Sequence, residues 1–262
     1  MTAAAIVFDK VCKSFDRGLV TAVDQVSLAV ADGEFLGIVG GSGSGKTTLL
    51  RLANRLIDAD SGTIAISGEA IEAGDPIELR RRIGYVFQSA GLFPHMTVAE
   101  NIGITPTLLG WSAARIKSRV DDLLGLVRLD GARYRSRFPH ELSGGERQRV
   151  GVARALAAEP RLILMDEPFG ALDPLTRDGL GEDYLALHRQ LGLTTIMITH
   201  DVTEAMLLAD RIAVMRAGRL VATGTPTELA ATRESYVREL MSTPRRQTER
   251  LTTLLAQAGP PT

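Results

Sequence analysis

Short runs rich in aliphatic and β-branched residues recur along the chain and predict strands. After the third run, helix-forming stretches separate most of these runs, which is the pattern of an α/β protein with a largely parallel sheet. The first two runs have no helix between them, so we expect an antiparallel edge. The predicted strands lie at residues 6–11, 21–30, 35–39, 63–67, 83–87, 162–165, 195–199 and 212–215.

The hydrophobic pattern changes between residues 88 and 154, where no run has the character of a strand. Residues 112–128 instead place apolar side chains at helical spacing. We therefore expect an inserted helical subdomain at about residues 89–154. Ordinary crossover helices are the alternative, but the length without a strand favours an insertion. The apolar positions with helical spacing are Ile116, Val120, Leu123, Leu124 and Val127.

Beyond residue 224 the pattern predicts helices at residues 226–231 and 235–241, followed by a polar stretch. We expect one domain over residues 1–241 and a peripheral, mobile tail over residues 242–262. No internal repeat or long heptad array is present in the sequence. This disfavours a protein with long coiled-coil arms.

Charge and composition narrow the function classes. The chain of 262 residues has 30 Lys and Arg against 31 Asp and Glu, a net charge of -1, so no overall basic field attracts nucleic acid and we expect no nucleic-acid partner. The single cysteine, Cys12, excludes an internal disulfide. The first ten residues lack the pattern of a signal peptide, and no apolar run approaches the roughly 20 residues that span a bilayer. Any membrane role would be a peripheral one.

The run GGSGSGKT at residues 40–47 matches the G-x-x-x-x-G-K-[ST] pattern of phosphate-binding loops. It follows the predicted strand 35–39 and precedes a helical stretch, as that pattern requires, so a merely flexible turn is disfavoured. Backbone N–H groups would face phosphate oxygens, the lysine would reach the β- and γ-phosphates, and the threonine hydroxyl would bind Mg²⁺. The candidate ATP-binding residues here are Gly40, Gly41, Ser42, Gly43, Ser44, Gly45, Lys46, Thr47 and Thr48.

Polar residues follow three of the predicted strands. The strand 162–165 leads into Asp166, a candidate Mg²⁺ ligand through water, and Glu167, a candidate general base for the attacking water. Gln88 follows the strand 83–87 and could reach Mg²⁺ or the water, while His200 follows 195–199 and could donate to the γ-phosphate. In isolation Gln88 would be a solvated residue at a strand end and His200 would be a structural residue; the neighbouring motifs favour a catalytic role for both. The candidate metal ligands are thus Thr47, Gln88 and Asp166, and the candidate catalytic residues are Glu167, His200 and Gln88.

A second phosphate-binding turn is predicted at LSGGERQR, residues 142–149. Ser143 and Glu146 have the spacing of a capping box, which directs the positive end of the following helix outward. Gly144 and Gly145 leave the approach to that helix end open for a phosphate. Because the loop at 40–47 already binds phosphate, the sequence predicts an ATP site that is completed by a second copy of the chain.

Two more residues are candidates for the nucleotide site. Phe15 could stack on adenine, although an isolated aromatic residue near a strand more often belongs to a core. Asp173, in the run GALDP, could cross a dimer interface, and its alternative role is to cap a helix that begins at Pro174.

Taken together, these residues resemble the ATP-binding cassette family. Walker A would be 40–47, the Q-loop Gln88, the signature 142–146, Walker B 162–166, the D-loop 171–173 and the H-loop His200. The resemblance covers most of the chain and implies an α/β fold: a P-loop NTPase (RecA-like) core with an antiparallel β edge and an inserted α-helical subdomain. It also implies ATP and Mg²⁺ as ligands and a head-to-tail homodimer of nucleotide-binding domains, with Ser143 and Gly145 of one chain on the γ-phosphate held by Lys46 of the other.

Within that family the chain is most similar to the ATPase subunits of osmoprotectant importers, which carry glycine betaine, choline, carnitine or proline betaine. The similarity rests on NRL at 54–56, DPIELRRRIGY at 75–85, GLFPHMT at 91–97 with Asn101, and FPHE at 138–141. It implies a transmembrane permease, an extracytoplasmic solute-binding protein and a peripheral location at the cytoplasmic face of the membrane. The run at 167–173 is common to many importers and supports the import direction.

The segment 91–101 carries apolar side chains in a stretch that glycine and proline interrupt. We expect it to help dock a coupling helix of the permease, and the alternative is a loop buried as a plug in the helical subdomain. The residues concerned are Leu92, Phe93, Pro94 and Met96.

The sequence departs from the family in three ways. Gly41 stands where the family often has proline or another residue, and Glu146-Arg-Gln replaces a glutamine-rich run that is common in close relatives. Too little sequence follows Leu255 for the regulatory CBS modules of many osmoprotectant ATPases, so none is expected. The alternatives are an importer ATPase for another solute, such as an amino acid, taurine or methionine, a soluble cassette ATPase acting on DNA or ribosomes, and a P-loop kinase. The run at 143–145 and His200 disfavour the kinase.

Overall fold

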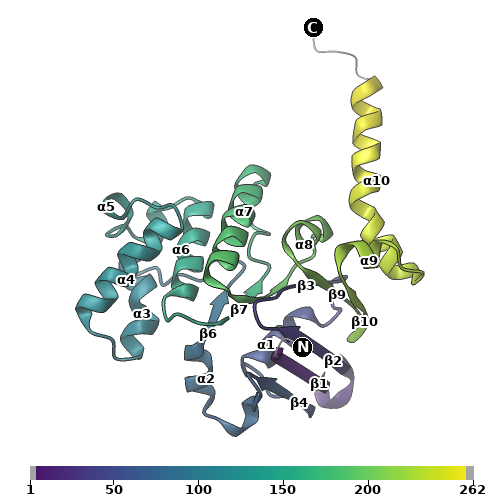
Figure 1. The fold of residues 1–262 in the computed structure, drawn as a ribbon, viewed down its shortest axis with the longest axis horizontal. Coiled ribbons are helices and arrows are strands. Elements are labelled where there is room, and N and C mark those ends of the chain that lie inside the picture. The colour runs from purple at the N-terminus through teal and green to yellow at the C-terminus, as the bar shows by residue number, and fades with distance from the viewer. Residues whose placement is uncertain (1–3, 258–262) are drawn as a thin grey trace.

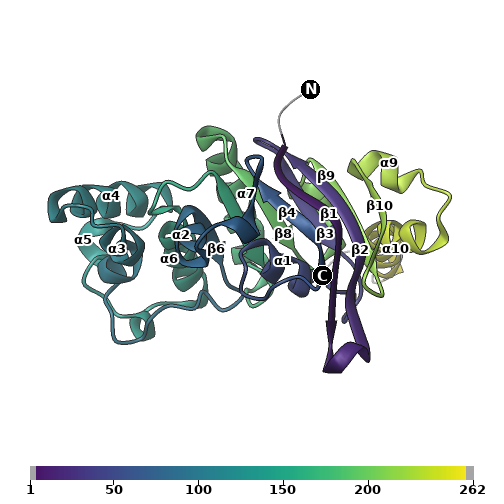
Figure 2. The same ribbon diagram turned by 90° about the horizontal axis from the view of Figure 1, so that it is seen from below.

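A six-stranded sheet forms the centre of the protein in the computed structural model, which describes residues 4–257 (Figures 1 and 2). Its strand order is β10-β9-β3-β8-β7-β6, and all neighbours except β10 and β9 pair in parallel. The carboxyl ends of β3, β6, β7 and β8 therefore meet at one edge, where ligands of such sheets bind. The strands are β3 (Phe35–Val39), β6 (Ile83–Val86), β7 (Leu162–Asp166), β8 (Thr194–Ile198), β9 (Arg211–Arg216) and β10 (Arg219–Gly224).

The predicted antiparallel strands form a sheet of their own with the order β2-β1-β4-β5. Helix α1 (Lys46–Ala53) packs its buried leucines between this sheet and the parallel one, in a shared apolar core. The antiparallel edge of the parallel sheet is β10. The sequence analysis predicted neither β10 nor the two-residue strand β5. The strands are β1 (Ala4–Phe15), β2 (Val20–Ala31), β4 (Ser61–Ile66) and β5 (Glu69–Ala70), with a short 3-10 helix (Asp16–Gly18) between the first two.

The strand-free region predicted between residues 88 and 154 is helical, and it lies at one end of the molecule (Figure 1). Helix α4 has Ser112 as its N-cap, and it buries Val120, Leu123 and Leu124 as the spacing predicted. The helices of this region are α3 (Val98–Leu108), α4 (Ala113–Leu126), α5 (Gly131–Tyr134), a 3-10 turn (Pro139–Glu141) and α6 (Gly144–Leu156).

The remaining helices flank the parallel sheet. Figure 1 shows α7 and α8 on one side of it, with α9 and α10 beyond β9 and β10. None of the helices formed by the described residues is both long and apolar enough to cross a lipid bilayer. These helices are α2 (Pro76–Arg82), α7 (Pro174–Leu191), α8 (Val202–Leu208), α9 (Pro226–Ala230) and α10 (Ser235–Gln257), with a 3-10 turn at Ile71–Ala73.

Helix α10 is longer than the sequence predicted. We expected it to end at residue 241, but it continues to Gln257 with Pro244 inside it. Residues of high helix propensity follow the proline, and the hydroxyls of Thr248 and Thr252 each donate to the carbonyl four residues earlier. The end of the predicted mobile tail, residues 258–262, lies outside the described residues.

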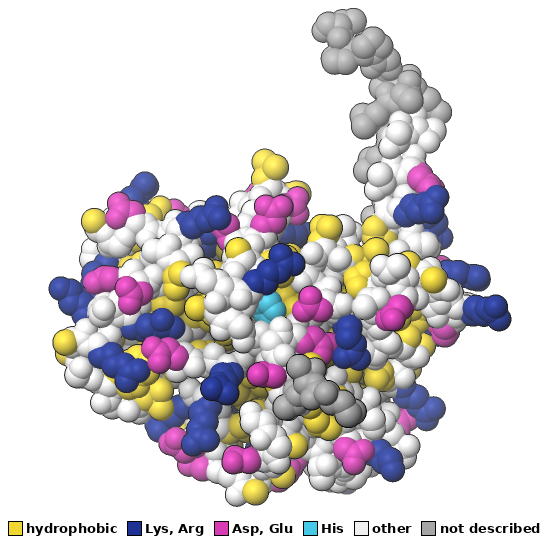
Figure 3. Space-filling view, viewed as in Figure 1, with side chains coloured by type: hydrophobic (Ala, Val, Ile, Leu, Met, Phe, Trp, Pro, Cys, Tyr) yellow, Lys and Arg dark blue, Asp and Glu magenta, His cyan; other side chains and the backbone are white. Residues whose placement is uncertain are grey.

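Surface charges are mixed. On the face shown in Figure 3, basic and acidic side chains alternate over the body of the protein, and α10 projects from that body. Neither positive nor negative charge therefore dominates this face, in agreement with the near-zero net charge of the chain.

Candidate functional site

The predicted phosphate-binding loop connects β3 to α1 at the carboxyl edge of the parallel sheet. Gly40 and Gly45 have φ angles of 154° and 100°, which only glycine adopts without strain. A Cβ atom on Gly45 would also overlap the carbonyl oxygen of Ala22, and one on Gly40 would overlap that of Met215. Close approach of two strands thus explains why the loop needs these two glycines.

Lys46 lies buried at the start of α1, with its ammonium group turned onto the loop. Its Nζ donates to the carbonyl oxygens of Gly40 at 2.8 Å and Gly41 at 3.1 Å. Burial lowers the pKa of Lys46, an effect that the carboxylates of Glu167 and Asp166 oppose. A buried ammonium beside unpaired N–H groups of a helix N-terminus is a suitable environment for phosphate oxygens.

The end of β7 offers a carboxylate to a cation. The Tyr85 hydroxyl donates to Asp166 Oδ2 at 3.3 Å, and burial raises the pKa values of both Asp166 and Tyr85. A half-buried carboxylate of this kind gains from a bound cation. Thr47, Gln88 and Asp166 supply the hard oxygen donors that Mg²⁺ prefers, and it usually binds through one or two carboxylates together with phosphates. In residues 4–257, no cluster of three or more His, Cys, Asp and Glu side chains is placed to hold a metal.

The structure brings the three predicted catalytic residues together at one carboxylate oxygen. Gln88 Nε2 donates to Glu167 Oε2 at 3.0 Å, and His200 Nδ1 lies 3.2 Å from the same atom. Glu167 adopts a φ of 47°, a left-handed conformation that is unfavourable for this residue type. Its backbone N–H donates to the carbonyl of Ile198 at 3.0 Å, which holds that conformation. Strain of this kind concentrates at functional sites.

Helix α6 holds the segment that carries Gln88. Gln148 Nε2 donates to the carbonyl of Phe87 at 3.0 Å, and the buried guanidinium of Arg154 donates to the carbonyls of Ala90 and Gly91, at 2.7 Å each. Burial lowers the pKa of Arg154. The sequence analysis missed these contacts. The clue that could have revealed them was the presence of two long polar side chains on the otherwise apolar face of a helix.

The capping box predicted at the start of α6 is confirmed. The Glu146 N–H donates to Ser143 Oγ at 3.2 Å, and the Ser143 N–H donates to Glu146 Oε2 at 2.7 Å. Hydrogen bonds from the Tyr134 hydroxyl and the Ser143 N–H lower the pKa of Glu146. Ser143 and Gly144 are exposed, so this helix end is open to a ligand or a partner.

Ser143, Gly144 and Gly145 do not meet the phosphate loop within one chain. In the described part of the chain, no hydrogen bond or ion pair connects them to residues 40–48. Figures 1 and 2 both draw α6 apart from α1. Gly145 instead packs on Thr176 of α7, where a Cβ atom would overlap the threonine methyl group.

Asp173 and Phe15 are both at the surface. Asp173 caps α7, accepting a hydrogen bond from the Thr176 N–H at 3.1 Å, and hydrogen bonding to Thr176 lowers the pKa of Asp173. Phe15, at the end of β1, is 41% exposed, and Lys13 Nζ lies 5.7 Å from the centre of its ring. The cap that the sequence suggested for Asp173 is therefore present, and Phe15 is not a core residue. Contacts of either residue with a nucleotide or a second chain stay predictions.

The segment 91–101 is a fixed loop with an exposed tip. Buried Asn101 accepts from the Phe93 N–H at 2.8 Å and donates to the carbonyls of Phe93, Met96 and Thr97. Phe93 is 40% exposed and Pro94 is also exposed, while Leu92 packs against the core. The segment thus has a buried part, as a plug in the helical subdomain would, and an exposed apolar tip; the docking of a coupling helix on that tip stays a prediction.

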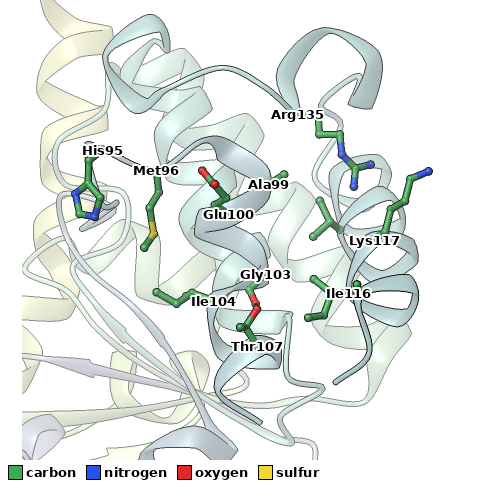
Figure 4. Close-up of a pocket in the computed structure, with 12 residues that line it drawn as sticks. His95, Met96, Ala99, Glu100, Gly103, Ile104, Thr107, Ile116, Lys117 and Arg135 are labelled. Atoms are coloured by element: carbon green, nitrogen blue, oxygen red, sulfur yellow. The ribbon is translucent and has the colours of Figure 1, made fainter. Parts of the chain in front are cut away.

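A groove of about 580 Å³ lies beside this loop (Figure 4). Residues of α3 and α4 face each other across it, and His95 and Met96 also line it. Its lining includes apolar side chains of both helices together with Glu100, Lys117 and Arg135.

Comparison with known proteins identifies the family. The profile of the ABC transporter family matches residues 23–170. The chain is 54% identical over 213 residues to the "Glycine betaine/carnitine/choline transport ATP-binding protein OpuCA" of Bacillus subtilis, covering 81% of this chain and 56% of that protein. It is 48% identical over 235 residues to the "Glycine betaine uptake system ATP-binding protein YehX" of Escherichia coli, covering 89% and 75%. The chain spans little more than half the length of the first of these relatives.

Solved structures agree with this assignment. The ATP-binding cassette MJ0796, solved as a dimer in a post-hydrolysis state with ADP and Pi, superposes with a TM-score of 0.76 at 32% identity, covering 84% of this chain and 98% of that one. CbiO1 from Clostridium perfringens, part of the transporter complex cbiONQ, gives a TM-score of 0.81 at 28% identity, covering 93% and 97%. The phosphate loop, the carboxylate cluster and the capped signature helix thus occur on a cassette fold, and the chain belongs to the ABC transporter family.

Proposed function

We propose that this chain is the ATP-hydrolysing subunit of an ABC importer that takes up an osmoprotectant, such as glycine betaine, choline or carnitine, through a partner permease. The observation that carries the hydrolytic part is the convergence of Gln88 and His200 on Glu167 Oε2, beside the phosphate loop. The relatives named as glycine betaine, carnitine and choline transport proteins support the solute class.

Each polar residue of the cluster has a chemical task in this proposal. The loop N–H groups at the start of α1 and Lys46 bind the phosphates of ATP, and Thr47, Asp166 and Gln88 hold Mg²⁺, which neutralises charge on those phosphates. Glu167 accepts a proton from the attacking water. His200 donates a hydrogen bond to the γ-phosphate, and Gln88 helps to orient the water.

A second copy of the chain completes each site in this proposal. Ser143 and Gly145 at the open end of α6 bind the γ-phosphate held by Lys46 of the other chain, and Asp173 crosses between them. Supporting observations are the exposure of Ser143 and its separation from the loop within one chain. Solved cassettes that are dimeric, at 32% and 33% identity, support a dimer.

The parts of the chain take different roles. We assign residues 1–241 to the nucleotide-binding domain, residues 89–154 to its helical subdomain and residues 242–262 to a peripheral tail. The exposed tip at Phe93 and Pro94, next to the groove between α3 and α4, receives a coupling helix of the permease. That contact places the chain at the cytoplasmic face of the membrane, and an extracytoplasmic protein delivers the solute to the permease.

Uptake in cells tests the whole proposal. The gene is deleted, and uptake of radiolabelled glycine betaine, choline, carnitine and amino acids is measured at high osmolarity, with complementation by the wild type or by Glu167→Gln. We expect loss of quaternary-amine uptake that only the wild type restores. Loss of amino-acid uptake alone would support the alternative solute class, and unchanged uptake of all solutes would contradict an importer.

A further inference from the structure

Helix α10 contacts the phosphate loop through one side chain. The backbone N–H of Gly41 donates to the hydroxyl oxygen of Tyr236 at 3.2 Å, a contact between residues 195 positions apart. Tyr236 lies in the first turn of α10. The last element of the described chain therefore reaches the loop that begins just after β3.

The two ends of the Gly41 residue are fixed by different partners. Its N–H is bound by Tyr236, and its carbonyl oxygen accepts from Lys46 Nζ at 3.1 Å and from the Ser44 N–H at 3.2 Å. A rotation of this residue would therefore disturb both the tyrosine and the lysine. Tyr236 is linked in this way to the ammonium group of Lys46, which is proposed to bind the phosphates.

Neighbouring side chains hold Tyr236 in place. The guanidinium of Arg216, at the end of β9, lies 4.7 Å from the centre of the tyrosine ring. Val237 and Met241, on the same helix, are buried against the body of the protein. Arg216 follows Met215, whose carbonyl oxygen occupies the place that a Cβ atom on Gly40 would take, so the tyrosine, the end of β9 and the loop lie close together.

We propose that Tyr236 is a positioning residue that couples α10 to the phosphate loop, so that the placement of α10 sets the affinity of the loop for nucleotide. The inference rests on the proposed function, because it takes ATP as the ligand of the loop. It assigns a role to α10, which projects from the body beyond its first turns (Figure 1). A protein that moved this helix would alter nucleotide binding without touching the nucleotide.

Tyr236→Phe separates the hydrogen bond from packing, because it keeps the ring over Arg216 and removes only the hydroxyl. Losing one hydrogen bond of ordinary strength corresponds to about a two- to tenfold change in an equilibrium constant. We expect the Kd for ATP, measured with the full chain by equilibrium dialysis, to rise by that factor. The rate at saturating ATP stays within about twofold. Thr252→Ala, which removes a hydroxyl farther along α10, is the matched control and leaves the Kd unchanged.

A double-mutant cycle assigns the effect to the Gly41 N–H. Gly41→Pro removes the donor, since proline has no N–H, whereas Gly41→Ala keeps it and brings a Cβ atom only to 3.8 Å from the Tyr236 hydroxyl. We expect Tyr236→Phe to weaken ATP binding in the Gly41→Ala chain and to have no further effect in the Gly41→Pro chain. Equal weakening in both chains would overturn the coupling, as would an unchanged Kd for Tyr236→Phe alone.

Hydrogen exchange gives a readout that needs no nucleotide and no Gly41 variant. The Gly41 amide should exchange about two- to tenfold faster in Tyr236→Phe than in the wild type. Unchanged exchange would overturn the inference even if Gly41→Pro failed to fold. Failure of the wild type to bind ATP would contradict the proposed function instead, and the exchange result would still decide whether Tyr236 restrains the loop.

Discussion

Gln88 Nε2 donates a hydrogen bond to Glu167 Oε2 across 3.0 Å, although the two residues are 79 positions apart in the chain. The same oxygen lies 3.2 Å from His200 Nδ1. One carboxylate at the end of β7 is therefore held by two side chains that follow β6 and β8, the strands on either side of it. The proposed base is thus oriented by the residues proposed to act with it.

Glu167→Gln should abolish ATP turnover and spare ATP binding, because the amide keeps the shape of the side chain but cannot accept the proton of water. General bases accelerate reactions by about 10²–10⁴-fold, so we expect kcat to fall by a factor of at least about 10². Phosphate release and ATP affinity are measured side by side, with the exposed Glu182→Gln as control. Normal turnover in Glu167→Gln would refute the role of this residue.

Ser143→Arg should prevent two ATP-bound chains from closing on each other, because the arginine would fill the open end of α6. In a Glu167→Gln background, ATP is expected to produce a stable dimer, detected by size-exclusion chromatography with light scattering. Adding Ser143→Arg should leave a monomer that still binds ATP through Lys46. Ser136→Arg, also at an exposed position, serves as the control. A dimer that persists with Ser143→Arg would argue against a shared site.

Tyr85→Phe should shift the acid limb of the ATPase pH profile to higher pH. Burial raises the pKa of Asp166, and the hydrogen bond from Tyr85 lowers it, so removal of the hydroxyl raises that pKa further. The protonated acid cannot bind Mg²⁺, so activity would be lost at a less acidic pH. The shift should shrink at high Mg²⁺, which competes with the proton. Tyr184→Phe, which removes a buried hydroxyl elsewhere, is the control. Identical acid limbs in Tyr85→Phe and the wild type would contradict an effect of the Tyr85 hydroxyl on the pKa of Asp166.

Glu204 should make stability depend on pH. Burial raises its pKa to about 7, while a hydrogen bond to Thr199 opposes the shift, and Glu204 Oε1 has no partner among the described residues. The folded state then binds more protons than the unfolded state from about the ordinary glutamate pKa up to about pH 7. The stability that protonation contributes is therefore complete at low pH and is lost as the pH rises through 7.

Glu204→Gln removes this titration and keeps the size of the side chain. We expect the variant to unfold at a higher temperature than the wild type at pH 8, by an amount equivalent to about 3 kcal/mol, and to show a flatter dependence of Tm on pH. Calorimetry between pH 5 and pH 8 measures both. Parallel curves for the two proteins would show that Glu204 titrates normally in the folded protein.

Phe93→Asp should weaken the association with the permease and leave the hydrolysis of the isolated chain unchanged. The side chain is at the exposed tip of the loop held by Asn101, so an added charge is tolerated by the fold but not by an apolar docking contact. Co-purification with the membrane fraction measures the association, and Leu108→Asp, at an exposed position at the end of α3, is the matched control. Equal retention of all three proteins would place the docking surface elsewhere.

Local patterns predicted much of the fold and the candidate site. All the predicted strands are present to within a few residues, as are the helix at 113–126 and the capping box of Ser143 and Glu146. These features depend on the periodicity of apolar side chains and on contacts between residues three or four positions apart, and both can be recognised in a linear sequence. The sequence missed β10 and the length of α10, where a proline lies inside a continuing helix.

The sequence by itself determined the phosphate loop, the acidic strand end and the signature turn, because each is a short segment whose backbone conformation its own residues dictate. Only the tertiary structure decided that Gln88 and His200 meet on one oxygen of Glu167, that Tyr85 contacts Asp166, and that Tyr236 reaches Gly41. Those contacts join residues far apart in the chain, and their geometry follows from strand order and from the packing of α6 and α10. Neither strand order nor packing is set by a local pattern.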